Sequence, residues 1–167
     1  MWTRLYWVDG PWPGRLALSA RPRGGDWLEE EIAAWRGVEV DTVLSLLTPD
    51  EERELDLGNE AQEVKRTGMK FLSLPIPDRQ VPQSESQITA TLEKLDIDLS
   101  AGKNVVIHCR QGIGRSGLVA ACLLISKGLS SGAAVESLTA ARGAAIPETP
   151  EQRRWIDRYA ATLASTK

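Results

Sequence analysis

Short apolar segments, separated by polar or glycine- and proline-rich stretches, recur along this 167-residue chain. Runs of about four to eight aliphatic and β-branched residues are typical of buried strands. Residues 10–14 contain two prolines and two glycines, which predicts a turn between the first two segments. The predicted strands lie at about 4–8, 15–19, 40–47, 70–74 and 104–107.

Longer segments with apolar residues three or four positions apart predict helices between and after these strands. Several begin with a polar capping residue followed three positions later by an acid or an amide. These pairs are Asp26 with Glu29, Thr48 with Glu51, Ser84 with Gln87, and Thr149 with Gln152. The predicted helices cover about 26–35, 48–67, 84–99, 116–127, 131–141 and 149–163.

The alternation of strands and helices predicts an α/β fold, because helices cross over between parallel strands. Prolines at 75, 77 and 82 keep 75–82 out of regular structure. A chain of this length buries about 70% of its unfolded surface in one core. We therefore expect a single domain over residues 1–167, with a central, mostly parallel sheet of about four to five strands flanked by helices.

The composition excludes several classes of protein. A hydrophobic share of 42% with 26% charged residues is that of an ordinary globular domain. The net charge of −3, with both signs interspersed, leaves no basic field for a nucleic-acid backbone. No apolar run approaches the roughly 20 residues of a membrane span, and the N-terminus lacks the features of a secretory signal. We expect a cytoplasmic monomer that binds neither nucleic acid nor membrane.

The inventory of reactive side chains is small. His108 is the only histidine, which excludes a multi-histidine metal site, and we expect neither a metal nor a cofactor. Cys109 and Cys122 are the two cysteines, and a reducing compartment argues against a disulfide between them. Cys122 lies in an apolar segment and is interpreted as a core residue. Of the six tryptophans, four precede residue 30 and are interpreted as packing of the N-terminal strand pair.

The decapeptide at 108–117, His-Cys-Arg-Gln-Gly-Ile-Gly-Arg-Ser-Gly, carries the strongest chemical signal. It lies between a predicted buried strand and a predicted buried helix, where backbone N–H groups converge at the helix start. Those donors, the helix dipole and Arg115 all favour the thiolate form of Cys109. Arg115 offers planar, bidentate donors that suit two oxygens of a phosphate group.

This decapeptide resembles the Cys-x5-Arg signature of the protein tyrosine and dual-specificity phosphatases. The resemblance implies a phosphatase-type fold in which Cys109 is the nucleophile and Arg115 the phosphate ligand. It also implies that loop residues surround the substrate phosphate: Arg110, Gln111, Gly112, Ile113, Gly114 and Arg115. His108 is interpreted as a structural support that holds the loop.

Further segments extend the resemblance. Residues 75–78, Pro-Ile-Pro-Asp, are similar to the general-acid loop of the dual-specificity enzymes, which makes Asp78 the implied acid; a turn-forming role is the alternative. Residues 142–152 are similar to a segment of the cyclin-dependent-kinase-associated phosphatases in which a glutamine positions water. Gln152 takes that role or only caps a helix. We interpret Arg142 as a surface residue rather than a phosphate ligand.

The resemblance implies a two-step reaction through a phosphocysteine, with Asp78 protonating the leaving oxygen and then activating water. Ser116 either caps the following helix or steadies the leaving thiolate. The uncharged Gln111 and Ile113 argue against a phosphoinositide headgroup. The expected partner is a phosphorylated protein, with phosphotyrosine and also phosphoserine or phosphothreonine as substrates.

Three alternatives belong to other classes. The spacing Gly112-x-Gly114-x-x-Gly117 fits a dinucleotide fingerprint, but the acidic residue expected about 20 positions on, Glu136, lies in a predicted helix. A phosphate-binding module without turnover has no need of both Cys109 and Asp78. A rhodanese-like sulfur transferase has a loop that is usually one residue shorter.

Overall fold

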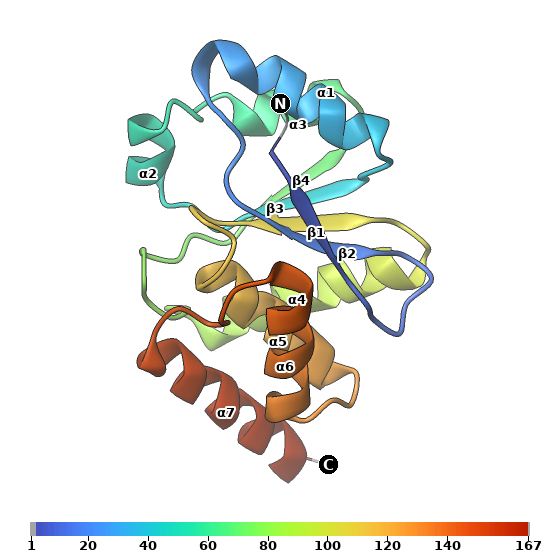
Figure 1. The fold of residues 1–167 in the computed structure, drawn as a ribbon, viewed down its shortest axis with the longest axis vertical. Helices are drawn as coiled ribbons and strands as arrows, with labels where there is room; N and C mark the ends of the chain where they lie inside the picture. The colour runs from blue at the N-terminus through green and yellow to red at the C-terminus, as the bar shows by residue number, and fades with distance from the viewer. Residues whose placement is uncertain (1–2, 167) are drawn as a thin grey trace.

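A five-stranded sheet lies at the centre of the computed structural model, which describes residues 3–166 (Figure 1). The strands follow the spatial order β1-β2-β5-β3-β4. Only β1 runs antiparallel to its neighbour, and the other pairings are parallel. The strands are β1 Leu5–Val8, β2 Leu16–Ser19, β3 Thr42–Ser45, β4 Lys70–Ser73 and β5 Val105–His108. The predicted α/β fold with a mostly parallel sheet is confirmed.

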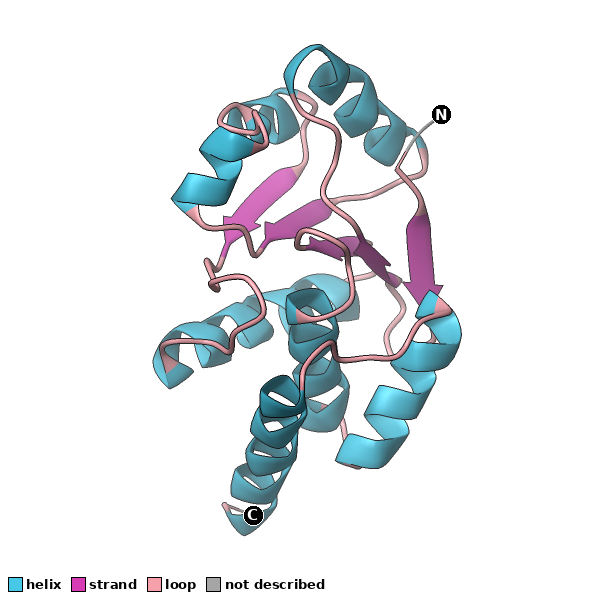
Figure 2. Ribbon diagram, turned by 60° about the vertical axis from the view of Figure 1, so that its left-hand side comes forward, coloured by secondary structure: helices cyan, strands magenta, loops and turns pink. Residues whose placement is uncertain are grey.

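Helices cover both faces of the sheet, as Figures 1 and 2 show. Helices α1 and α3 pack on one face, and α4 to α7 lie on the other. None of the helices within residues 3–166 is both long and apolar enough to span a bilayer. The helices are α1 Leu28–Gly37, α2 Pro49–Glu54, α3 Glu60–Arg66, α4 Glu85–Ser100, α5 Arg115–Ser126, α6 Ser131–Arg142 and α7 Pro150–Ser165.

The central strands are buried on both faces because each faces a layer of helices. Along β5, Ile107 points into the larger apolar cluster with α4 to α7, whereas Val106 points into the smaller cluster with α1 and α3. On β3, Leu44 points into the larger cluster and Val43 into the smaller one. This two-sided burial explains why these strands are continuous apolar runs rather than alternating ones.

The predicted capping box of Asp26 with Glu29 is wrong. Gly25 has a φ of 59° and opens a short 3-10 turn, Gly25–Trp27, ahead of α1. Asp26 therefore lies inside this turn, and α1 begins after Trp27 without a side-chain cap. The boxes of Thr48 and Thr149 are both present.

The polar segment from 48 to 67 is two helices rather than one. Helix α2 ends at Glu54, Asp56 takes a φ of 56°, and α3 begins at Glu60. The break turns Leu57 into the smaller apolar cluster, where it is fully buried. The neighbours of Leu57, namely Asp56, Gly58 and Asn59, are poor helix formers, so the break lies where helical preference is lowest.

The N-terminal tryptophans have separate environments. Trp12 is buried and its indole N–H donates to Asp96 over 2.8 Å. Arg15 stacks over the ring of Trp7 at 4.0 Å, and Trp27 is largely exposed. Trp2 lies outside the described residues. The interpretation as packing of the N-terminal strand pair therefore holds for Trp7 on β1 and Trp12 in the turn after it, but not for Trp27.

A buried carboxylate ties α4 to the sheet. Asp98 accepts from the hydroxyl of Thr42 on β3 over 2.8 Å and from the ammonium group of Lys70 on β4 over 3.1 Å. Thr42 is fully buried, so its hydroxyl has no access to water in place of this acceptor.

We predict that Asp98→Ala lowers the free energy of unfolding by roughly 2 to 3 kcal/mol, because it leaves the buried Thr42 hydroxyl without a hydrogen-bond acceptor. Urea denaturation measures this loss. The matched control is Asp157→Ala, which removes an exposed helix pair with Arg153 and should cost less than about 0.5 kcal/mol. Equal losses in the two variants would contradict the role given to Asp98.

Candidate active site

The decapeptide forms a tight loop at the carboxyl edge of the parallel strands. It leaves β5 at His108 and enters α5, whose first backbone bonds run from Gly117 N to Ile113 O and from Leu118 N to Gly114 O. Gly112 has a φ of 75°, and a Cβ there would lie 2.6 Å from the carbonyl carbon of Ser19 at the end of β2. Glycine adopts this φ without strain, and any larger residue would place its Cβ against the Ser19 backbone.

Cys109 lies at the floor of the loop and is 3% exposed. The backbone N–H of Gly112 donates to Sγ over 3.3 Å. Because the loop opens the N-terminus of α5, the helix dipole also favours negative charge at this point.

Arg115 is buried beside this sulfur and is held by a carboxylate. Its two terminal nitrogens donate to the two oxygens of Glu51 over 2.6 and 2.9 Å. Nη1 also donates to the carbonyl of Ile76 over 2.8 Å, and Nη2 to Oδ1 of Asp78 over 3.0 Å. These bonds fix the plane of the guanidinium group, which two-point recognition of a phosphate requires.

The two members of this buried pair stabilise each other's charge. Burial raises the pKa of Glu51, but the hydrogen bonds from Arg115 and Thr48 and the charges of Arg115 and Arg110 outweigh it, so the pKa lies below the ordinary 4.5. Burial lowers the pKa of Arg115, yet the carboxylates of Glu51 and Asp78 and the Cys109 sulfur raise it overall. Both groups are therefore ionised at neutral pH.

Asp78 completes the site from the loop between β4 and α4. Its side chain is 47% exposed, and it shares a cavity of about 120 Å³ with Cys109 and Arg115. The prediction that 75–82 lacks regular structure is confirmed, which leaves this loop free to present the carboxyl group at the pocket. The other residues lining the cavity are Arg79, Arg110, Gln111, Gly114 and Glu148.

The rim of the cavity is lined by charged side chains in pairs. Arg79 lies 3.4 Å from Glu148, and Arg110 lies 3.1 Å from Glu54. Arg110 and Gln111, predicted as substrate-binding residues, both line this cavity. Each rim arginine already has a carboxylate partner, so the mouth has no uncompensated cluster of positive charge.

Gln152 caps α7 and also touches two loops of the site. Its Oε1 accepts from the backbone N–H groups of Glu148 and Thr149, and its Nε2 donates to the carbonyl of Gln80 over 3.0 Å. A Cβ on Gly114 would lie 3.0 Å from its Oε1. The capping interpretation is confirmed, and the same amide connects α7 to the Asp78 loop.

Other predicted site residues lie beneath the pocket rather than on its wall. Ile113 packs against the larger apolar cluster. Ser116 is fully buried in the first turn of α5, with its hydroxyl unpartnered among residues 3–166. The alternative that Ser116 caps the helix is wrong, because α5 begins at Arg115 and Gly114 is the N-cap residue.

His108 lies beneath the loop, at the end of β5. It is fully buried on β5, and its Nδ1 lies 3.4 Å from the carbonyl oxygen of Cys109. Its Nε2 lies 2.6 Å from Oε2 of Glu60 on α3. The ring of Trp35 packs beside it, with centroids 5.9 Å apart.

Arg142, interpreted from the sequence as a surface residue, is half-buried and contacts the loop. Its guanidinium donates to the carbonyl of Gln111 over 3.0 Å and to that of Gly112 over 3.2 Å, and it stacks over Tyr6 at 4.0 Å. It therefore holds the backbone of the loop rather than a phosphate. The end of α6 reaches the loop through the fold, which residue spacing does not reveal.

Sequence reasoning also missed Glu51 and Glu60 as partners of site residues. Glu51 was recognised only as the third residue of a capping box, and that box is what aims its carboxylate at Arg115. Glu60 lies in the segment predicted as one continuous helix. A buried arginine requires a buried carboxylate, so a search for such partners is the signal that points to them.

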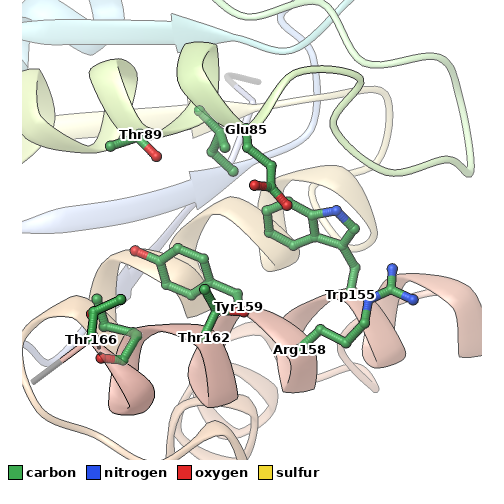
Figure 3. Close-up of a pocket in the computed structure, with 9 residues that line it drawn as sticks. Glu85, Thr89, Trp155, Arg158, Tyr159, Thr162 and Thr166 are labelled. Carbon is green, nitrogen blue, oxygen red and sulfur yellow. Dashed lines mark hydrogen bonds between the residues drawn. The ribbon is translucent and has the colours of Figure 1, made fainter.

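A larger hollow of about 310 Å³ lies between α4 and α7, and Figure 3 shows the stacked Trp155 and Tyr159 on its wall. It shares no lining residue with the Cys109 cavity. Its lining within residues 3–166 includes neither cysteine nor histidine. The same part of the chain has no cluster of three or more histidine, cysteine or acidic side chains placed to hold a metal. The Cys109 cavity is therefore the candidate active site.

The fold and the loop together define a protein of the dual-specificity phosphatase superfamily. A family model described as "Swiss Army Knife protein, DSP-PTPase phosphatase domain" matches residues 3–158. The chain belongs to this family.

Individual relatives agree with this assignment. Cyclin-dependent kinase inhibitor 3 of Sus scrofa is 38% identical over 93 residues, which are 54% of this chain and 43% of that protein. The chain thus matches less than half the length of this relative. The structure of Tk-PTP in its active form is 30% identical with a TM-score of 0.79, covering 96% of this chain and 99% of that one.

A further solved structure shows the same fold. Kinase associated phosphatase, carrying a serine in place of its catalytic-site cysteine, aligns with a TM-score of 0.89 over 99% of this chain and 98% of its own. Its sequence identity is 22%, so the likeness concerns the fold.

We predict that Glu51→Gln lowers the free energy of unfolding by about 3 kcal/mol near neutral pH, because it leaves Arg115 buried without a compensating charge. The pKa of Glu51 is lowered on folding, so its stabilising contribution is complete above 4.5 and is lost as the pH falls through the lower folded-state value. Chemical denaturation over a pH series should show native protein and variant converging in acid.

The control for this series is Glu54→Gln, which removes a largely exposed partner of Arg110. It should change stability by less than about 1 kcal/mol at every pH. If the difference in free energy of unfolding between native protein and Glu51→Gln stayed constant into acid, the charge of Glu51 would not be the source of the stabilisation.

Proposed function

We propose that this protein is a cysteine-dependent phosphatase that removes phosphate from phosphorylated protein side chains. The observation that carries the proposal is the meeting of Cys109, Arg115 and Asp78 at one cavity, although the last is 31 positions from the first along the chain. Nucleophile, phosphate ligand and acid are the three groups that the reaction needs.

The first step transfers the phosphoryl group to sulfur. Two oxygens of the phosphate accept hydrogen bonds from the guanidinium of Arg115. One of them takes the place of Asp78 as the acceptor at Nη2. The Cys109 thiolate forms a bond to phosphorus while the bond from phosphorus to the side-chain oxygen breaks. The phosphate ester enters as its monoanion and passes its proton to Asp78, which is released from Arg115 and gives that proton to the leaving oxygen.

The second step returns the enzyme to its starting state. Water attacks the phosphocysteine, the sulfur–phosphorus bond breaks, and Asp78 takes a proton from the water and passes it to the departing phosphate. The unpartnered hydroxyl of Ser116 lies within the first turn of α5 and can donate to the departing thiolate. Gln152 can turn its Nε2 from the carbonyl of Gln80 to the water. No metal or cofactor is required in this scheme.

The dimensions of the cavity favour a phosphorylated side chain as substrate. At about 120 Å³ it is well below the roughly 300 Å³ at which sites for whole small molecules begin. The cavity therefore has room for a phosphate group while the rest of the substrate lies outside, as in a phosphoprotein. The paired charges at the rim, Arg79 with Glu148 and Arg110 with Glu54, disfavour a headgroup with several phosphates.

A phosphate-binding module without turnover is the second candidate. Its support is the cradle itself, which binds an oxyanion whether or not chemistry follows. The presence of Asp78 at the same cavity argues for turnover, because a carboxylate beside a phosphate weakens binding unless it serves as an acid.

We predict that Cys109→Ser reduces the release of phosphate from phosphopeptides by on the order of 10⁴-fold or more, because serine is not ionised at neutral pH. Inorganic phosphate release from phosphotyrosine, phosphoserine and phosphothreonine peptides measures this. Cys122→Ala, at the buried cysteine of α5, should leave turnover within about twofold. Native protein that binds the peptides without releasing phosphate would favour the binding module.

We predict that Asp78→Ala slows the reaction by about 10²- to 10⁴-fold on alkyl phosphates, whose oxygen leaves poorly without a proton. The loss should be smaller on an aryl phosphate with an acidic leaving group. The comparison of kcat/KM on the two substrates measures the difference, with Asp157→Ala, of similar exposure, as control. Equal rates for Asp78→Ala and native protein on the poor leaving group would remove Asp78 from the mechanism.

A further inference from the structure

The acid loop, residues 75–82, is an exposed arch that packing alone does not hold at the cavity. Ile76 and Pro82 are buried near its two ends, whereas residues 78–80 are exposed. Arg79 has a φ of 64°, a left-handed conformation that is unfavourable for a residue with a Cβ. Such a backbone persists where its surroundings fix it. The position of the Asp78 carboxyl group therefore depends on the polar contacts of this arch.

Within residues 3–166, three polar contacts tie residues 77–80 to other segments. They join Asp78 to Arg115, Arg79 to Glu148, and Gln80 to Gln152. In the second of these contacts, Nη1 of Arg79 lies 3.4 Å from Oε1 of Glu148. The backbone N–H of Glu148 in turn donates to Oε1 of Gln152 over 3.2 Å. The arch and the segment that leads into α7 are therefore joined in one network.

The proposed reaction breaks two of these three contacts. In the first step a phosphate oxygen takes the place of Asp78 on Arg115, and in the second step Gln152 turns from the arch to the attacking water. The ion pair of Arg79 with Glu148 takes part in neither exchange. It therefore stays available to hold the arch after the acid has left Arg115.

We propose that Arg79 and Glu148 are positioning residues whose ion pair keeps the carboxyl group of Asp78 at the cavity while phosphate occupies Arg115. The inference rests on the proposed function, because it concerns the acid of that reaction. Both side chains line the cavity beside Asp78, and their opposite charges attract. They are 64% and 26% exposed, so water and salt screen the attraction. Loss of the pair should therefore weaken acid catalysis without abolishing it.

The test compares kcat on an alkyl phosphate, whose oxygen leaves poorly without a proton, with kcat on an aryl phosphate that has an acidic leaving group. Glu148→Gln keeps the size of the side chain and removes its charge. We expect kcat on the alkyl phosphate to fall about three- to fivefold, the range that an exposed ion pair allows. On the aryl phosphate it should stay within about twofold of native protein. Equal kcat values for variant and native protein on the alkyl phosphate would overturn the proposal.

Two double variants show whether the effect runs through the ion pair and through the acid. Arg79→Asn removes the guanidinium group and introduces a residue that tolerates the left-handed backbone. Arg79→Asn with Glu148→Gln should be no slower than the slower single variant, because both changes remove one ion pair. In the Asp78→Ala background, Glu148→Gln should slow the reaction no further. Additive losses in either double variant would show that Glu148 acts by another route and would refute the inference.

Ionic strength provides a measurement that a merely structural role would not change. Because salt screens the pair, native kcat on the alkyl phosphate should fall toward that of Glu148→Gln as sodium chloride is added. The matched control is Glu54→Gln, which removes the partner of Arg110 on the same rim and has no contact with the arch within residues 3–166. Its ratio of kcat values on the two substrates should equal that of native protein. A native kcat that does not respond to salt would contradict the role given to the pair.

Failure of the proposed function gives different results. If native protein releases no phosphate, or if Asp78→Ala matches native protein on the alkyl phosphate, the proposed acid is wrong and the inference fails with it. If Asp78→Ala is slow while Glu148→Gln matches native protein, the acid stands and only the positioning role is refuted.

Discussion

The bond between Arg115 and Glu51 is the constraint on which the rest of the site depends. A guanidinium group is expensive to bury, and here its cost is offset by a two-point carboxylate bond and a backbone carbonyl. Because Glu51 belongs to α2, and the carbonyl of Ile76 to the loop after β4, a single side chain draws three segments together at the carboxyl edge of the sheet. The phosphate loop, the acid loop and α2 are arranged around this one cation.

Local patterns predicted a large part of this arrangement. Apolar runs located all five strands, and the capping residues Thr48 and Thr149 marked helix starts correctly, because these signals depend on neighbours in the chain. The loop from Cys109 to Arg115 was recognisable for the same reason. Its chemistry is contained in seven consecutive residues, so no long-range information was needed to predict an anion cradle.

The predictions that failed concern contacts between residues that are far apart in the chain. Arg142 and Glu60 gave no local sign of their partners, 30 and 48 positions away along the chain. Spacing within a sequence reports which residues share a face, not which faces meet. Contacts of that kind follow from the topology of the sheet and are visible only in the folded chain.

The contacts of Arg142 limit how far the domain can be shortened without disturbing the phosphate loop. Its guanidinium lies between Tyr6, on the edge strand β1, and two carbonyls of the loop, so the first hairpin and the end of α6 meet at the phosphate loop. A fragment trimmed to the stretch around the signature would keep the nucleophile yet lose the clamp on its backbone. The edge strand β1 and the end of α6 therefore help to fix the conformation of the anion-binding loop.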